Sequence, residues 1–402
     1  MIVGGNGVPA VQFGVDRLVD GGAASLKGLR VGLVTNDAAV TAVHPRPLVP
    51  VRVALLAAGV HLVRLYSPEH GLAAAARDGE SVPEGFDAMT HLPVESLYGA
   101  SCRPTVRSLE DIDVLLVDLP DIGARFYTYI WTLSHAMEAC AEAGKPLHVL
   151  DRPNPLGGDL ALAEGPILGP EISPSLVGRW PIPVRHSLTL GELARVWNAE
   201  QRIGVDLSVR RVEGWRRDLR WPALGLPFVP ASPAMPSWET ALLYPGTCLL
   251  EGLAISEGRG AAVPFRVAGA PWVDAVPLAC AFNRAELPGV LARPTRFRPA
   301  AGRYRDQECA GIMLHVTDEG AFRPVAAGLH LISLIWALHP GRCAWAGSPA
   351  ANPAGAAHFD RLIGSREIRR HVEAPGADFA GRVTGWTGAP GWSERATPHL
   401  LY

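Results

Sequence analysis

The segment from Pro50 to Gly71 reads PVRVALLAAGVHLVRLYSPEHG and contains signals for a helix followed directly by a strand. Its first part, Pro50 to Ala58, predicts a helix, because proline is favoured at the first helical position and Gly59 is a stop signal. The alternating apolar run from His61 to Tyr66 predicts a strand. Helices that alternate with strands in this way are typical of a parallel α/β sheet.

Similar patterns recur on both sides of this segment. Three further strands are predicted at Arg30–Asn36, Asp113–Asp118 and Pro146–Asp151. Two further helices are predicted, at Phe126–Gly144 and from Leu190 to about residue 201, the second opening with a Thr189–Glu192 capping box. The first domain is therefore predicted to be an α/β domain.

The composition indicates two domains. The chain has 402 residues, of which 48% are hydrophobic and 19% charged, which is more than one core usually organises. Segment 222–236 is rich in proline and segment 246–269 in glycine, so we predict domains at 1–245 and 246–402, the second a smaller mixed domain with its clearest helix at Val325–Leu338.

Charge and hydropathy narrow the range of partners. A formal net charge of -2 shows no basic excess, so nucleic acid is not an expected partner. No run reaches about 18 apolar residues, so no membrane span is expected. Met1 to Ala10 lacks the pattern of a signal peptide, which predicts a cytoplasmic location and leaves export by another route open. The oligomeric state is not predicted.

Polar residues follow each predicted strand of the first domain. In parallel sheets, ligands bind outside the carboxyl ends of the strands, so these residues are predicted to face one crevice. Taken singly, each could instead be a turn or cap residue. The residues concerned are Asn36, Glu69, His70, Asp118, Asp121, Arg125, Asp151, Arg152 and Asn154.

A second polar group lies near the predicted domain boundary, in Glu251-Gly252 and in Ser256 to Gly260. If that segment is extended, Glu257 and Arg259 point the same way. The alternative is an ordinary hairpin loop with a solvated ion pair.

Motifs for other chemistry are absent. The first strand leads into Thr35-Asn36-Asp37 and not into G-x-G-x-x-G, and the chain has no phosphate loop, G-x-S-x-G elbow or H-E-x-x-H pattern, so no cofactor and no metal are expected. The alternative is an isolated metal site formed by His70, Asp121 and Asp151. The remaining chemistry is that of carboxylates, which glycoside hydrolysis uses in pairs, and Glu69 is the best placed candidate.

Several of these segments also resemble a known family, the NamZ-type exo-β-N-acetylmuramidases. They include GLVTN (32–36), SPEHG (67–71), DIGARFYTYIWT (121–132), LDRPNPLGG (150–158), YPGTCLLEG (244–252) and SEGRG (256–260). The resemblance extends from about Gly14 to Tyr402. It implies a Rossmann-like domain and a smaller α/β domain that enclose an active-site cleft, and hydrolytic release of N-acetylmuramic acid from the non-reducing ends of peptidoglycan fragments.

The resemblance also implies roles for particular residues. Glu69 is the leading acid/base candidate, beside His70, and Glu257 ranks above Asp121 and Glu251 as its partner carboxylate. N-acetylmuramic acid carries a lactyl carboxylate, which a guanidinium can bind with two hydrogen bonds. Arg125, Arg152 and Arg259 are the candidates for that contact, with Arg125 the most structural of the three. The other residues expected to bind substrate are Asn36, Tyr127, Asp151, Asn154 and Glu251.

Three positions depart from the family's pattern: Pro120, Ala234 and Leu253-Ala254 replace polar residues. These changes predict an altered sugar preference, or a protein that binds amino sugars without cleaving them. The other alternative is an unrelated α/β enzyme that acts on a phosphorylated or nucleotide ligand.

Overall fold

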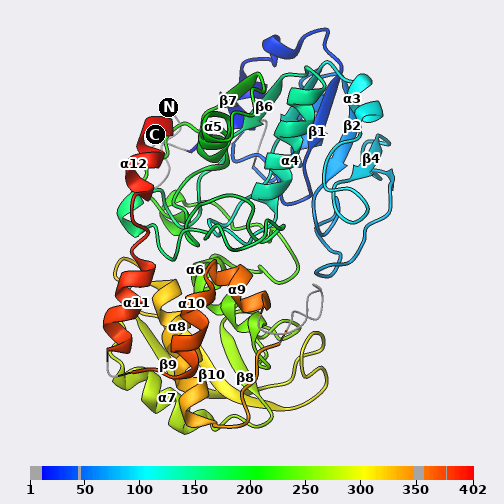
Figure 1. The fold of residues 1–402 in the computed structure, drawn as a ribbon. Helices are drawn as coiled ribbons and strands as arrows, with labels where there is room; N and C mark the ends of the chain where they lie inside the picture. Colours follow the sequence, from blue (N-terminus) through cyan, green and yellow to red (C-terminus); the bar gives the residue numbers. More distant parts are fainter. Residues whose placement is uncertain (1–10, 44–46, 347–356, 377) are drawn as a thin grey trace.

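The computed structural model describes residues 11–43, 47–346, 357–376 and 378–402. In this part of the chain the strands form two sheets, one in each of two domains, which lie one above the other in Figure 1. The larger sheet has seven strands and the smaller has three. The predicted fold class, an α/β domain followed by a smaller mixed domain, is confirmed.

The larger sheet is parallel except at one edge. Its order is β3-β4-β2-β1-β5-β6-β7, and only β3 and β4 pair in antiparallel fashion. Strand β1 lies between β2 and β5, because the later strands are added first on one side of β1 and then on the other. The carboxyl ends of β1 and β5 therefore flank the topological switch point. The strands are β1 (Val31–Val34), β2 (Leu62–Ser67), β3 (Gly85–Phe86), β4 (Pro93–Ser96), β5 (Val114–Val117), β6 (Leu147–Leu150) and β7 (Leu207–Arg210).

Alternating side chains of the central strands belong to two separate hydrophobic cores. In β5, Leu115 and Val117 pack in the core that contains α4 and α5, whereas Val114 and Leu116 pack in the core that contains α1 and α2. This division arises because successive side chains of a strand point to opposite faces of the sheet. Each face is covered by helices, as is usual for a parallel sheet. These helices are α1 (Gly14–Asp20), α2 (Val51–Ala57), α4 (Tyr129–Glu142) and α5 (Leu190–Glu200).

The predicted elements agree with the observed ones to within a few residues at their ends. The capping box of α5 is present, because the Thr189 hydroxyl accepts a hydrogen bond from the Glu192 amide and the Glu192 carboxylate accepts one from the Thr189 amide. One detail was wrong: Pro50 is the residue before α2, in an extended conformation, and not its first helical residue. The predicted helix at 126–144 begins only at Tyr129.

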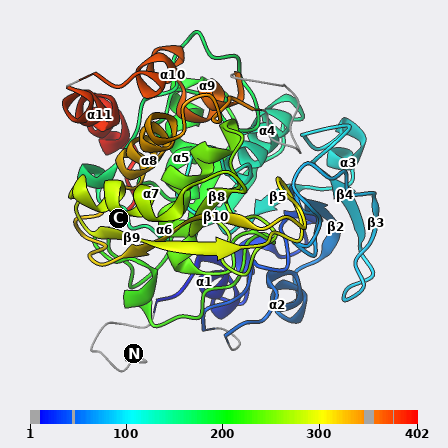
Figure 2. The same cartoon turned by 90° about the horizontal axis from the view of Figure 1, so that it is seen from below.

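The second domain is built on an antiparallel sheet. Its order is β8-β10-β9, and α7 packs on β9 and β10 with α8 beside it (Figure 2). The predicted boundary at residue 245 lies within α6, which packs against α8. The elements of this half are α6 (Trp238–Thr247), β8 (Val267–Ala270), α7 (Ala275–Arg284), β9 (Val290–Phe297), β10 (Cys309–Val316), α8 (Pro324–Leu338), α9 (Ala357–Ile363), α10 (Arg366–Glu373) and α11 (Phe379–Thr387). The last helix, α12 (Trp392–Ala396), lies beside the first domain, where the Trp392 indole donates a hydrogen bond to the His186 carbonyl.

The last residues of the chain return to the first domain. The Tyr402 hydroxyl donates a hydrogen bond to Asp151 (2.7 Å), and the Leu401 amide donates one to the carboxylate of Glu192 on α5 (2.9 Å). The chain therefore connects the two domains twice, once through α6 and once through the segment before α12 (Figure 1). Among the helices described, none is both long enough and apolar enough to cross a bilayer.

Candidate active site

A cavity of about 330 Å³ lies between the two domains. This volume is at the lower end of the range for small-molecule sites, roughly 300–1,000 Å³. The first domain contributes Glu69, His70, Asp78, Tyr98, Tyr127 and Thr128 to the lining. The second contributes Cys248, Glu251, Arg259, Phe265, His358 and Arg361.

Glu69 lies in the turn that follows β2, and its side chain is held by two hydrogen bonds. Its relative exposure is 8%. One carboxyl oxygen accepts a hydrogen bond from the Gly79 amide (3.1 Å) and the other accepts one from the Thr128 hydroxyl (2.7 Å). The Tyr98 hydroxyl also interacts with this carboxylate, which adds to the effect of burial in raising the pKa of Tyr98. A carboxylate has about four lone-pair sites, so at least one stays available to a ligand. The turn is tight, with φ of 68° at His70 and 74° at Gly71.

His70 supports the same turn. Its Nδ1 lies 2.8 Å from the carbonyl oxygen of Ala76, and its Nε2 lies 3.8 Å from a carboxylate oxygen of Asp78. Because a carbonyl oxygen only accepts hydrogen bonds, Nδ1 carries the hydrogen in this contact. His70 is thereby oriented with Nε2 toward Asp78.

From the second domain, Arg259 contacts three carboxylates, which we call the acidic wall: Asp78, Glu251 and Glu257. Its guanidinium lies 2.5 Å from Asp78, 2.7 Å from Glu251 and 3.3 Å from Glu257. It also lies over the Phe265 ring, 4.8 Å from the ring centroid. Glu257 and Arg259 do point the same way, but both side chains are largely buried, so they do not form the solvated pair of the alternative prediction.

The three carboxylates differ in their ionisation. Burial disfavours the charged form of Glu251, but Arg259 and His358 outweigh burial and lower its pKa to about 2. Burial raises the pKa of Glu257 to about 7, and the charge of Glu251 adds to the increase. Burial also raises the pKa of Asp78, which Arg259 only partly offsets. At neutral pH Glu251 is therefore ionised, and Glu257 is near the midpoint of its titration.

Several predicted site residues lie outside this lining, with their polar atoms used by the chain itself. The Asn36 amide donates to the Tyr129 hydroxyl (3.0 Å), and the Asn154 amide donates to the Leu188 carbonyl (2.9 Å). Asp151 accepts hydrogen bonds from Thr189, Gly191 and Tyr402. These residues shape the carboxyl edge of the sheet and do not line the cavity.

Two of the three predicted arginines also lie outside the lining. The guanidinium of Arg125 is fully buried and donates to the carbonyl oxygens of residues 166, 182 and 362. Arg152 pairs with Asp118 and donates to the Val40 carbonyl (2.9 Å). Only Arg259 of the three faces the cavity, and its guanidinium is paired there with the carboxylates of the acidic wall. Glu257 contacts Arg259 but is not itself part of the lining.

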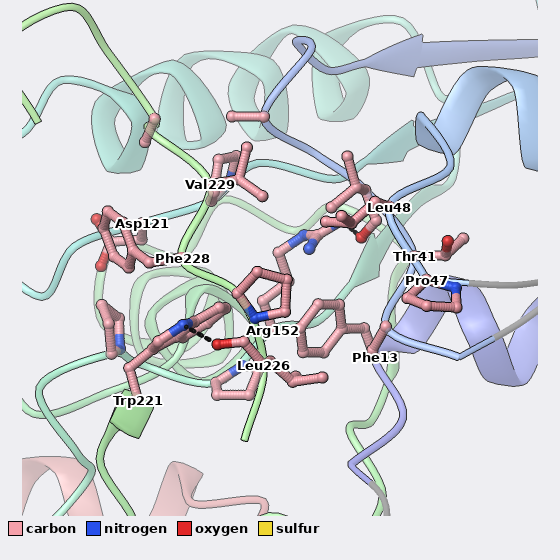
Figure 3. A pocket seen from close by; sticks show the side chains of 18 of the residues that line it. Phe13, Thr41, Pro47, Leu48, Asp121, Arg152, Trp221, Leu226, Phe228 and Val229 are labelled. Carbon is pink, nitrogen blue, oxygen red and sulfur yellow. Dashed lines mark hydrogen bonds between the residues drawn. The ribbon is translucent and has the colours of Figure 1, made fainter. Parts of the chain in front are cut away.

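Asp121 faces a second cavity of about 40 Å³ over the ends of β1, β5 and β6 (Figure 3). Most of its lining is apolar, including Phe13, Trp221 and Phe228. Asp121 accepts a hydrogen bond from the Gly123 amide (2.9 Å) and lies 3.2 Å from Nε2 of His186. A space of this size holds about one water molecule and not a sugar ring.

The positions that depart from the family's pattern lie in three different places. Ala234 lines the large cavity, whereas Pro120 lines the small one. Leu253 is fully buried, and Ala254 pairs with Ala344 through its backbone. Of these positions, only Ala234 changes the lining of the large cavity.

The sequence pattern did not identify some residues of the lining. Asp78, Tyr98, Thr128, His358 and Arg361 belong to loops and helices that carry no strand-end signal. Of these five residues, only Thr128 lies in a segment that the sequence analysis had singled out, within the run FYTY at 126–129. In the ranges that the structure describes, no three or more His, Cys, Asp or Glu side chains are arranged to hold a metal ion. His70, Asp121 and Asp151 are not brought together.

The fold and the cavity define a class: a two-domain α/β protein with a buried carboxylate at a strand end, in an interdomain cavity that also contains a cluster of carboxylates around an arginine. Such a site suits acid/base hydrolysis of a polar bond. The chain belongs to the NamZ exo-β-N-acetylmuramidase family, because the model of the N-terminal domain matches residues 31–239 and that of the C-terminal domain matches residues 242–402.

Individual relatives agree with this assignment. The chain is 40% identical over 365 residues to the peptidoglycan β-N-acetylmuramidase NamZ of Bacillus subtilis (strain 168), covering 91% of this chain and 85% of that protein. Two solved DUF1343 family proteins of Bacteroides fragilis NCTC 9343 share the fold, each covering 98% of this chain and 99% of their own. The first has a TM-score of 0.86 at 34% identity, and the second 0.76 at 26%.

Proposed function

We propose that this protein is a glycoside hydrolase that releases N-acetylmuramic acid from the non-reducing ends of peptidoglycan fragments. Membership of the NamZ family and the 40% identity to a peptidoglycan β-N-acetylmuramidase support the reaction. The observation that carries the proposal is Glu69, a buried carboxylate oriented by Thr128 and Gly79 at the wall of a cavity of about 330 Å³. A cavity of this size suits one terminal sugar residue.

In the proposed reaction, Glu69 is the acid that donates a proton to the leaving group. It protonates the glycosidic oxygen as the bond to the anomeric carbon breaks. Water then adds to that carbon, and the proton that the water releases restores the acid form of Glu69. Positive charge develops on the sugar ring in this transition state. Glu251 suits the role of the charged partner, because it lines the same cavity and its pKa of about 2 keeps it ionised. This choice replaces the higher rank that the sequence gave to Glu257.

The test is release of chromophore from a β-glycoside of N-acetylmuramic acid, with the matching N-acetylglucosamine glycoside as the control substrate. We expect turnover of the first substrate and little of the second. If the protein binds N-acetylmuramic acid but hydrolyses neither glycoside, it is a binding protein and the proposed function is wrong. Hydrolysis of the N-acetylglucosamine glycoside alone would assign a different sugar specificity.

A further inference from the structure

Two guanidinium groups reach the large cavity in the part of the chain that the structure describes, and they differ in what surrounds them. Arg259 is occupied by the acidic wall, with carboxylate oxygens at 2.5, 2.7 and 3.3 Å. Arg361, on α9, lines the same cavity, and no hydrogen bond or ion pair to another described residue engages its side chain. Arg361 is therefore a half-buried cation that faces the cavity without a partner among the residues that the structure describes.

The neighbours of Arg361 do not neutralise it. The adjacent acid, Asp360, pairs with Arg369 through contacts of 2.9 and 3.4 Å. Arg361 also lines an adjoining cavity of about 280 Å³, whose lining includes Arg366 and Arg369. The local charge is thus positive, and Arg361 stands between this side cavity and the main one.

The backbone that carries Arg361 is firmly placed. Its neighbour Leu362 is buried, and the Leu362 carbonyl accepts a hydrogen bond from the buried guanidinium of Arg125 (2.8 Å). Phe359 is fully buried against Gly252, where an added Cβ would lie 2.6 Å from the Phe359 side chain. A rigid support of this kind is what a specificity contact requires, because little order then has to be gained on binding.

We propose that Arg361 binds the lactyl carboxylate of the terminal N-acetylmuramic acid residue, an inference that rests on the proposed function for the identity of the sugar. Electrostatics set the orientation: the positive charge of Arg259 is already paired with the acidic wall, whereas the positive charge of Arg361 is available to attract a carboxylate. A guanidinium can hold a carboxylate with two parallel hydrogen bonds. N-acetylglucosamine lacks the lactyl group, so it leaves this cation unpaired, and Arg361 selects between the two sugars.

The test is calorimetric binding of free N-acetylmuramic acid, its lactyl methyl ester and N-acetylglucosamine. We expect Arg361→Met to weaken binding of the acid by about 10- to 100-fold, the usual loss for a hydrogen-bonded charge, and to leave the other two ligands unchanged. Arg361→Lys keeps the charge without the paired hydrogen bonds and should fall between. Arg370→Met, an exposed arginine of α10 away from the cavity, is the matched control.

Two results would overturn the inference. One is equal affinity of the wild-type protein for the acid and its methyl ester, which needs no variant and so does not depend on how Arg361→Met folds. The other is equal weakening of all three ligands by Arg361→Met, which indicates a structural role. Turnover is a separate readout: loss of the proposed hydrolysis with Arg361-dependent binding intact would contradict the function and leave this inference standing.

Discussion

Glu69 and Arg361 differ from most charged residues near the cleft in how much of their bonding capacity is free. The Glu69 carboxylate contacts Gly79, Thr128 and Tyr98 and keeps part of its bonding capacity, and Arg361 makes no hydrogen bond with another described residue. Asp151, by contrast, accepts three hydrogen bonds and is fully buried. A polar group has to keep bonding capacity in order to act on a ligand, so Glu69 and Arg361 are the two to test.

The hydrogen bond from Thr128 to Glu69 is expected to contribute to the rate. Thr128→Val removes the hydroxyl and leaves the carboxylate free to rotate, so kcat should fall by roughly 10-fold with little change in KM, in line with the loss of one hydrogen bond to a charged group. Thr128→Ser keeps the hydroxyl and is the control. An equal loss of kcat in both variants would show that the hydroxyl is not what matters.

Part of this site could be predicted from the sequence. Glu69, Glu251 and Arg259 were identified because they follow a strand or lie in a glycine-rich segment, and all three line the cavity. Asn154 and Asp151 follow a strand in the same way, but they serve the fold. Sequence alone does not separate the two cases, because turn-capping and catalysis use the same residue types at the same strand ends.

At the level of elements, Glu164 connects the first domain to the start of α8. Its carboxylate accepts a hydrogen bond from the Ala326 amide (2.8 Å), and its second oxygen has no hydrogen-bond partner among the described residues. Burial raises the pKa of Glu164 to about 7, although this amide and Arg185 favour the charged form. The free oxygen is the one that can carry a proton without losing a hydrogen bond.

This shift predicts a pH-dependent stability. Between the ordinary value of 4.5 and about 7, the folded protein holds a proton on Glu164 that the unfolded chain has lost, so the free energy of unfolding falls as pH rises through this range. Glu164→Gln mimics the protonated form and should remove up to about 3 kcal/mol of that fall. The measurement is denaturant unfolding of both proteins at pH 5 and pH 8.

The exposed Glu84→Gln is the matched control and should keep the pH dependence of the wild-type protein. Asp151 and Glu257, whose pKa values burial also raises, contribute equally to the wild-type protein and to both variants. An unchanged pH dependence in Glu164→Gln would show that Glu164 is ionised in the folded protein throughout this range.

The central strands were predictable because they are buried on both faces and read as apolar runs. Strands β1 and β5 have every residue buried. Strand β7, at one edge of the sheet, alternates half-buried and exposed residues, and β4 has one fully buried residue, Glu95. These two strands, one at an edge of the sheet and one next to the other edge, carry no apolar run, so their existence depends on pairing with a neighbour and not on their own sequence.

For the molecule as a whole, the cleft exists because the chain leaves the first domain and returns to it. Arg361 is 292 residues from Glu69, and only the packing of α9 beneath the first domain brings both into one lining. No sequence pattern specifies such a contact. The chain end returns to the first domain, where Leu401 and Tyr402 form hydrogen bonds with Glu192 of α5 and with Asp151 after β6.

Tyr402 is expected to stabilise this return of the chain end. Its hydroxyl donates to Asp151 (2.7 Å) and accepts from the Val212 amide (2.9 Å). Tyr402→Phe removes both bonds and leaves two buried groups short of a partner, which should lower the free energy of unfolding by about 1–3 kcal/mol in a denaturant titration. The initial rate at 25 °C should not change, because Tyr402 does not line the cavity. A large loss of rate with full stability would contradict this role.

The central claim is that Glu69 performs the proton transfer in hydrolysis. The most direct measurement is the rate of sugar release from a β-glycoside of N-acetylmuramic acid by the wild-type protein and by Glu69→Gln, together with the affinity of each for free N-acetylmuramic acid. We predict that the substitution lowers kcat by about 10²–10⁴-fold, the usual contribution of a general acid or base, and changes the affinity little. Turnover by Glu69→Gln close to that of the wild-type protein would contradict the claim.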